Sequence, residues 1–329
     1  MIITKTPYRI SFFGGGSDYP SWYEKNGGAV LSTTIDKFLY ISCRFSPKYF
    51  KKKYRIVWRK IENVQRVNQI NHKVVRELLK YLKIKPGLEI HYYGDLPARS
   101  GMGSSSCFTV GLMQSLYGIK KINLNKLDLA KKSIYFEQNV MKEVVGSQDQ
   151  VSATYGGFNK IVFKTGGGFN VFPFSSKKKK IQKLNKNLLL VYSGLTRTAH
   201  HIAKSYVHKL QTSKKSHILE ILNFVKEGER ILKEGKLDDF GKLLHESWLE
   251  KKSLSPLITN SHIDEIYDLA LKKGALGGKL LGAGGGGFLV FYVPHHKQKN
   301  FIRHFKNLIN VPFKFTSEGS NIMFNNFND

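Results

Sequence analysis

The chain has 329 residues, enough for two domains of ordinary size or one large one, and 41% of them are hydrophobic, so a substantial core can form. With 23% charged residues the composition is not that of a disordered or fibrous chain, and no stretch approaches the roughly 18 apolar residues of a membrane-spanning helix. The formal net charge is +29, from 53 Lys and Arg against 24 Asp and Glu, which makes a nucleic-acid partner worth weighing.

The positive charge is mostly Lys and is spread along the chain. Its densest runs, 51–53 and 177–180, are not interleaved with aromatic residues as on a nucleic-acid reading surface. A solvated basic surface is therefore the first interpretation, steering of anionic substrates the second and nucleic acid a distant third. The N-terminus has no apolar signal-peptide core, so we expect a cytoplasmic protein. Cys43 and Cys107 are predicted to be buried, reduced thiols.

Strands and helices mix in the first half of the chain. Residues 2–13 alternate and predict a strand, and the β-branched and aromatic residues of 29–45 predict one or two more. Residues 88–93 predict another strand. Apolar residues at helical spacing predict helices over 102–117 and 126–141.

The polar stretch 175–186 predicts a boundary between two domains, 1–180 and 181–329. The apolar run at 188–192 predicts a buried strand that opens the second domain. The remaining predicted elements are helices over 199–210, 216–233, 238–251 and 261–273, a strand over 287–293, a helix over 295–308 and a last strand near Phe313. Strands at both ends of a helical run indicate an α+β fold with helices packed on one sheet face.

The first of three glycine-rich loops covers residues 13–20, Phe-Gly-Gly-Gly-Ser-Asp-Tyr-Pro, and follows the strand that carries Arg9. Glycine permits positive φ and lets the backbone approach a ligand closely. Asp18 would add a carboxylate beside that exposed backbone, and such a group suits sugar hydroxyls. Taken alone, the loop is better explained as a tight turn in which Asp18 bonds its own backbone.

The second loop covers residues 97–106, Pro-Ala-Arg-Ser-Gly-Met-Gly-Ser-Ser-Ser, and leads into an apolar helix. Free N–H groups and the positive end of the helix dipole make such a turn an anion site, and serine hydroxyls add donors for phosphate and a ligand for Mg²⁺. A serine-capped helix explains one serine, but not three serines preceded by two glycines. The chain has no G-x-x-x-x-G-K-[ST] pattern, so this is not a Walker A loop.

The third loop, 277–287, has seven glycines among eleven residues. So many glycines cost backbone entropy, which indicates close approach of the backbone to a ligand or to another glycine loop.

Two carboxylates complete the candidate site. Glu137 lies late in the helix predicted over 126–141, and Asp149 comes just after a glycine turn at Gly146. Asp149 could accept a proton from a sugar hydroxyl or orient it, and Glu137 could hold Mg²⁺. Considered singly, each is better explained as a surface or capping group.

Together the loops resemble those of the GHMP kinase superfamily, which includes galactokinase, homoserine kinase, mevalonate kinase and phosphomevalonate kinase. The second loop is similar to the family's P-x-x-x-G-[LM]-G-S-S phosphate loop, residues 279–287 to its C-terminal glycine-rich motif, and residues 7–14 to its N-terminal motif. Order and spacing agree, so the resemblance covers nearly the whole chain. It implies two domains, an N-terminal α/β domain (1–180) and a ferredoxin-like C-terminal domain (181–329).

Finer features narrow the resemblance. Five stretches are similar to the D-glycero-D-manno-heptose 7-phosphate kinases: 14–20, 28–32, 148–150, 155–159 and 277–287. Those enzymes use ATP to phosphorylate the anomeric O1 of the heptose 7-phosphate, giving the 1,7-bisphosphate on the path to GDP-heptose for bacterial surface polysaccharide. Galactokinases have Gly-Glu-His where this chain has three glycines at 14–16, so their galactose contacts are missing. A kinase for another sugar (fucose, galactose or mannose type) and a non-catalytic sugar and ATP sensor of the same fold are the alternatives.

The resemblance also implies roles for individual residues. Asp149 is expected to be the catalytic aspartate, Arg9 the basic residue near the transferring phosphate, and Glu137 and Ser105 the Mg²⁺ ligands. The expected ATP ligands are Gly101, Met102, Gly103, Ser104, Ser105 and Ser106. The expected sugar-phosphate ligands are Gly15, Gly16, Ser17, Asp18, Arg197, Gly284 and Gly285.

Arg197 is the first candidate for holding the 7-phosphate, because it follows a predicted strand in a turn that leads into a helix. An ordinary surface arginine explains it equally well. The expected partners are small molecules, ATP and heptose 7-phosphate, without nucleic acid or membrane, and a homodimer is left open.

Overall fold

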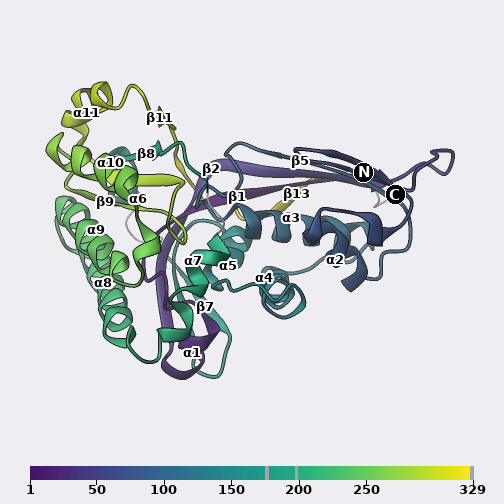
Figure 1. Cartoon of the computed structure of the whole chain (residues 1–329), viewed down its shortest axis with the longest axis horizontal. Coiled ribbons are helices and arrows are strands. Elements are labelled where there is room, and N and C mark those ends of the chain that lie inside the picture. Colours follow the sequence, from purple (N-terminus) through teal and green to yellow (C-terminus); the bar gives the residue numbers. More distant parts are fainter. Residues whose placement is uncertain (175–177, 197–198, 327–329) are drawn as a thin grey trace.

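The computed structural model describes residues 1–174, 178–196 and 199–326, and two sheets form its frame (Figure 1). The first sheet has nine strands: β1 (Ile2–Phe13), β2 (Gly28–Phe45), β3 (Tyr54–Val57), β4 (Ile61–Val64), β5 (Leu88–Gly94), β6 (Phe158–Phe163), β7 (Phe169–Pro173), β12 (Phe315–Thr316) and β13 (Asn321–Asn325). The second sheet has four: β8 (Leu188–Tyr192), β9 (Gly277–Leu280), β10 (Phe288–Tyr292) and β11 (Ile309–Asn310).

The long strand β2 organises the first sheet. It pairs antiparallel with β1 along most of its length, and its far edge is shared by β6 near Gly28 and by β5 near Phe45. Its run of β-branched and aromatic residues suits a half-buried strand. The sequence predicted one or two strands here, and the structure has one of 18 residues.

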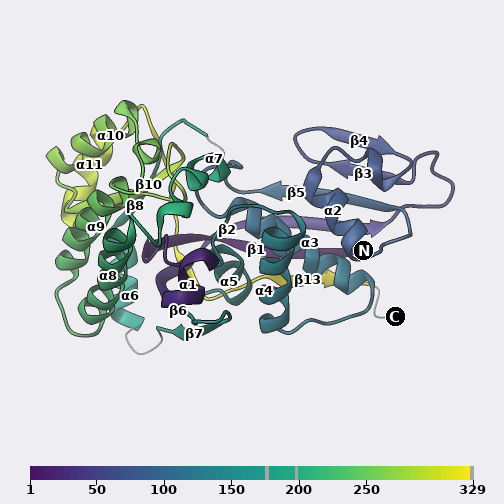
Figure 2. The same ribbon diagram turned by 60° about the horizontal axis from the view of Figure 1, so that its bottom comes forward.

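Helices α2 (Lys73–Tyr81), α3 (Ser104–Ile119), α4 (Lys126–Tyr135) and α5 (Gln148–Tyr155) accompany the first sheet (Figure 2). Helix α3 packs directly on β1 and β2, and apolar side chains such as Val110, Leu112 and Leu116 are fully buried there. Burial on this scale contributes roughly 1.5–3 kcal/mol for each large apolar side chain. The N-terminus of α3 is therefore held rigidly relative to the end of β1.

The second sheet has strand order β11-β8-β10-β9, and its neighbouring strands are antiparallel. Numbered along the chain, this order is fourth, first, third and second strand, the arrangement of a ferredoxin-like sheet, as expected. Its helices are α7 (Ala199–Lys204), α8 (Lys215–Lys233), α9 (Leu237–Lys252), α10 (Ser261–Lys272) and α11 (Gln298–His304). Helices α8 and α9 also pack on β1, which brings the second half of the chain against the first sheet.

Several predicted elements need correction. The strand predicted near Phe313 is β12, but it is not the last strand, because β13 follows it. Both return to the first sheet, beside β2 and β1. The helix predicted over 126–141 is α4 followed by a π-helical turn, Phe136–Val140. The helices predicted over 199–210 and 295–308 are the shorter α7 and α11, each next to a 3₁₀ turn.

Some elements were not predicted at all. They are α1 (Pro20–Asn26), α6 (Lys178–Lys186), α2, α5, β3, β4, β6, β7, β9, β11 and β13. The proposed division after residue 180 falls within α6, next to the start of the second sheet at Leu188. Both cysteines are buried and free, as predicted.

Candidate active site

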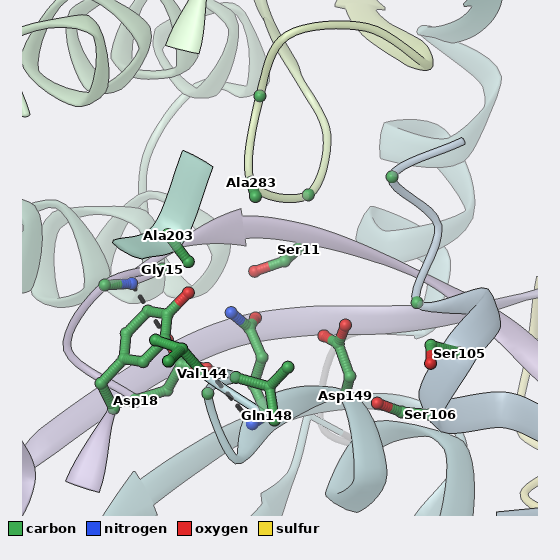
Figure 3. Close-up of a pocket in the computed structure, with 18 of the residues that line it drawn as sticks. Ser11, Gly15, Asp18, Ser105, Ser106, Val144, Gln148, Asp149, Ala203 and Ala283 are labelled. Atoms are coloured by element: carbon green, nitrogen blue, oxygen red, sulfur yellow. Dashed lines mark hydrogen bonds between the residues drawn. The ribbon is translucent and has the colours of Figure 1, made fainter. Parts of the chain in front are cut away.

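A cavity of about 360 Å³ lies where the three glycine-rich loops meet (Figure 3). The end of β1, the N-terminus of α3 and the start of α5 line one side of it, and α9, β9 and the third loop line the other. Figure 3 shows Asp18 and Gly15 on one flank and Asp149, Ser105 and Ser106 on the opposite flank, with the third loop at Ala283 facing them. Residues far apart in the sequence thus converge on one space.

The second and third loops touch each other through their backbones. A Cβ on Gly101 would overlap the carbonyl oxygen of Leu281, and a Cβ on Gly282 would lie 2.6 Å from Gly101 Cα. Both glycines also have positive φ, +80° and +71°. The Phe288 N–H donates to Ser100 O at 3.0 Å. Close approach to another glycine loop, one of the two explanations offered by the sequence, therefore accounts for glycine here.

The N-terminus of α3 opens onto the cavity. Gly103, with φ +76°, is its N-cap residue, and Ser104, Ser105 and Ser106 follow as the first helical residues. The unpaired N–H groups of a 16-residue helix and its dipole favour an anion at this end. Met102 instead points into the core and is fully buried.

Arg9 and Asp149 form a bidentate ion pair on the side of the cavity next to α3. Arg9 Nε donates to Asp149 Oδ1 at 2.7 Å, and Arg9 Nη2 donates to Asp149 Oδ2 at 2.8 Å. The third guanidinium nitrogen, Nη1, donates to Gly101 O at 2.7 Å. The geometry fixes the carboxylate beside the phosphate loop, and each carboxylate oxygen keeps a lone pair for another donor.

Glu137 is buried behind the helix N-terminus, on the π-helical turn. Its Oε2 accepts from Ser106 Oγ at 2.9 Å and from Gln150 Nε2, whereas its Oε1 is buried without a partner among the described residues. Burial raises the pKa of Glu137 to about 7, against the opposing effect of its hydrogen bonds. A π-helical turn often marks a functional position because it redirects one side chain.

Glu137 fits one end of a magnesium site. Its orphaned oxygen is a hard ligand, and Mg²⁺ is commonly held by one or two carboxylates together with phosphate oxygens and water. Ser106 is the serine that contacts Glu137, while the predicted ligand Ser105 is exposed at the cavity wall. The described residues contain no group of three His, Cys, Asp or Glu side chains suited to a metal ion.

Asp18 is fully buried at the other flank. Its carboxylate accepts from the Gly16 N–H at 3.0 Å and from the Gln148 N–H at 3.3 Å. A Cβ on Gly146 would collide with this carboxylate, so the turn before α5 requires glycine. Burial raises the pKa of Asp18 to about 6. The self-bonded turn suggested by the sequence is present, and it also links the first loop to α5.

Two lysines that the sequence did not single out line the opposite side. Lys251 Nζ, from α9, donates to Leu280 O at 2.8 Å and to Gly282 O at 2.6 Å. Lys279 Nζ, from β9, donates to Phe12 O at 2.6 Å. Burial lowers the pKa of Lys279 to about 7, and the positive charge of Arg9 lowers it further. Burial also lowers the pKa of Lys251, and the charges of Lys279 and Arg9 act in the same direction.

Comparison with known proteins agrees with this geometry. The model of the GHMP kinases N terminal domain matches residues 69–157, and that of the GHMP kinases C terminal matches residues 230–309. A D-glycero-alpha-D-manno-heptose 7-phosphate kinase from Campylobacter jejuni is 32% identical, over 97% of each chain. The chain belongs to the GHMP kinase family. It is an ATP-dependent sugar kinase, with small-molecule substrates.

Solved structures show the same fold for the kinase. A D-glycero-D-manno-heptose 1-phosphate kinase from Bacteroides thetaiotaomicron has a TM-score of 0.80 at 22% identity, covering 98% of this chain and 99% of that one. Lactococcus lactis galactokinase complexed with galactose has a TM-score of 0.74 at 18% identity, covering 97% and 94%. In the part of the kinase that the structure describes, we find no helix with the length and apolarity needed to cross a bilayer.

The predicted site residues do not all reach the cavity of the kinase. Those that line it are Arg9, Gly15, Gly16, Asp18, Gly101, Gly103, Ser104, Ser105, Ser106, Glu137, Asp149 and Gly284. Ser17 instead donates to Gly14 O and Ala29 O within its own turn, and the Gly285 N–H donates to Ile258 O. Arg197 lies outside the described residues.

Proposed function

We propose that this kinase transfers the terminal phosphate of ATP to the anomeric O1 of D-glycero-D-manno-heptose 7-phosphate. The product would be the 1,7-bisphosphate, a precursor of GDP-heptose for surface polysaccharide. The proposed location of the enzyme is the cytoplasm. The observation that carries the proposal is the order of groups in one cavity: a helix N-terminus for phosphate, then the Arg9–Asp149 pair, then the buried Asp18. The Campylobacter relative supports the choice of sugar.

In the proposed reaction the N-terminus of α3 and its serines hold the triphosphate. Arg9 offsets negative charge on the moving phosphoryl group, because its guanidinium lies between the phosphate loop and Asp149. Asp149 orients the O1 hydroxyl or takes its proton as O1 attacks the γ-phosphorus and ADP leaves. Positioning and charge stabilisation of this kind supply most of the catalysis in phosphoryl transfer.

Glu137 is the proposed Mg²⁺ ligand, with a serine of the phosphate loop beside it. The metal would neutralise charge on the phosphate oxygens. The free Oε1 supports this role, and the contact from Ser106 Oγ holds the carboxylate in place. Ser105 lines the same end of the cavity and stays a proposed second ligand.

Asp18 with Gly15 and Gly16 is the proposed sugar subsite. The first loop and Gln148 lie beside each other, since a Cβ on Gly15 would be 3.6 Å from Gln148 Nε2. In this proposal residues 1–180 supply the phosphate loop and catalytic aspartate, and residues 181–329 supply the third loop with Gly284.

Two alternatives remain open. A kinase for another sugar would use the same phosphate site, as the fold shared with galactokinase illustrates. A non-catalytic sensor would bind ATP and sugar without needing a carboxylate in contact with Arg9, so the intact pair favours an enzyme.

A coupled ADP-release assay with Mg-ATP tests the substrate. We expect turnover of heptose 7-phosphate to exceed that of mannose, fucose, galactose and mevalonate by at least about 100-fold in kcat/KM, because a buried site built for one ligand leaves polar groups unpaired with the others. Turnover of another sugar without turnover of heptose 7-phosphate would overturn the choice of substrate, and binding without turnover of any sugar would favour the sensor.

A further inference from the structure

Cations in the cavity differ in what balances their charge. Arg9 is paired with Asp149. Lys251 and Lys279 have no carboxylate partner among the residues that the structure describes, and their ammonium groups donate hydrogen bonds to backbone carbonyl oxygens. An ammonium group in a largely enclosed site is costly unless an anion balances it.

The two lysines are not equivalent. Lys279 is 5% exposed and its ammonium ties β9 to the end of β1 through Phe12 O, which makes it a tether between the two halves of the molecule. Lys251 is only partly buried and lies on the cavity wall. Its ammonium has three N–H donors, of which two reach Leu280 O and Gly282 O. One donor is therefore left for a ligand.

The segment that carries Lys251 also reaches the first loop, which holds the proposed sugar subsite. Leu254, three residues further along the chain, approaches the first loop, since a Cβ on Gly16 would lie 3.9 Å from Leu254 Cδ1. Ser247 lies one helical turn before Lys251 and also lines the cavity, so its hydroxyl shares that helix face. The triphosphate has its own anion site at the N-terminus of α3.

We propose that Lys251 is a specificity-determining residue that binds the phosphate group already carried by the sugar substrate, with Ser247 as a neighbouring donor. This inference rests on the proposed function, because it assumes a phosphorylated sugar in the subsite of Asp18. The loop carbonyls of Leu280 and Gly282 hold the ammonium in place before the substrate arrives. A neutral sugar would leave this cation without a counter-charge.

The test compares Lys251→Met with the matched control Lys252→Met. Lys252 is the next residue of α9, but it pairs with Asp264 outside the cavity. We measure binding of heptose 7-phosphate and of unphosphorylated heptose by calorimetry, and the KM for both sugars and for ATP. A charge-assisted hydrogen bond to phosphate predicts a roughly 10- to 100-fold weaker affinity for the phosphorylated sugar in Lys251→Met. Affinity for heptose and the KM for ATP should not change, and Lys252→Met should resemble the wild type.

Equal losses on both sugars, or a fall in kcat without a change in sugar-phosphate affinity, would overturn the inference, since Lys251 would then serve the fold or the transferred phosphoryl group. Unchanged affinity would overturn it as well. Lys251→Gln serves if the Met variant does not fold, because its amide can still donate to the loop carbonyls without a charge. Wild-type turnover tests the proposed function separately, whereas the binding difference tests the anion subsite even if no phosphate is transferred.

Discussion

The charged side chains on the two sides of the cavity differ in their partners. On the side of α3 and α5, Asp149 is paired with Arg9, and Asp18 and Glu137 accept two hydrogen bonds each. On the side of α9 and β9, Lys251 donates to two backbone oxygens and has no carboxylate partner among the described residues. The first side is organised before any substrate arrives, which is where phosphoryl transfer needs fixed groups. The second side gains its counter-charge from the substrate, which suits selection of a phosphorylated sugar.

The largest expected effect is the loss of turnover in the variant Asp149→Asn, on the side of α3 and α5. The amide can accept only one of the two hydrogen bonds from Arg9 and is no base, so turnover should fall by about 10²-fold or more while ATP binding is retained. Steady-state kinetics and nucleotide titration measure the two properties. Asp239→Asn, at an exposed ion pair with Lys242, is the control. Near-normal turnover would remove Asp149 from catalysis.

Asp18 sharpens the comparison, because it is a buried carboxylate on the side of α3 and α5 that forms no ion pair within the described part of the chain. Burial raises its pKa from 3.8 to about 6, so the folded state favours the protonated form. This contribution to stability is fully present below about pH 4 and is lost as pH rises through 6, amounting to about 3 kcal/mol.

Asp18→Asn removes that titration. The unfolding free energy of the variant minus that of the wild type should therefore rise by up to about 3 kcal/mol between pH 4 and pH 7. Urea unfolding at a series of pH values measures it. A difference that stays flat with pH would mean that Asp18 is ionised in the folded protein at the same pH as in the unfolded chain.

The smallest effect expected concerns Glu137 and Mg²⁺. The carboxyl must be ionised to hold the metal, and its pKa is raised to about 7, so the half-saturating Mg²⁺ concentration should rise about tenfold from pH 8 to pH 6. Glu137→Gln should need roughly tenfold more Mg²⁺ at pH 8 and lose most of that pH dependence. Kinetic titrations with Mg²⁺ measure both.

The control for this change is Glu89→Gln, at another buried glutamate, which pairs with Arg44 away from the cavity. Its Mg²⁺ dependence should match that of the wild type. The same Mg²⁺ requirement in Glu137→Gln and in the wild type would show that the metal is held elsewhere.

The sequence alone determined the local parts of this protein. Alternation of residue types over 2–13 predicted a strand whose ends coincide with those of β1, and the glycines and serines at 101–106 predicted the turn that opens α3. These features could be predicted because strand periodicity, glycine backbone freedom and helix N-termini depend on neighbours in the chain.

Only the tertiary structure decided which helix faces meet the cavity and which strands pair. Lys251 and Lys252 are adjacent and chemically identical in sequence, yet Lys251 lines the cavity and Lys252 pairs with Asp264. Similarly, β13 pairs with β1 across almost the whole chain length, although nothing near Asn321 indicates the partner. Such choices depend on packing between distant segments, and side-chain burial follows from that packing rather than from local sequence.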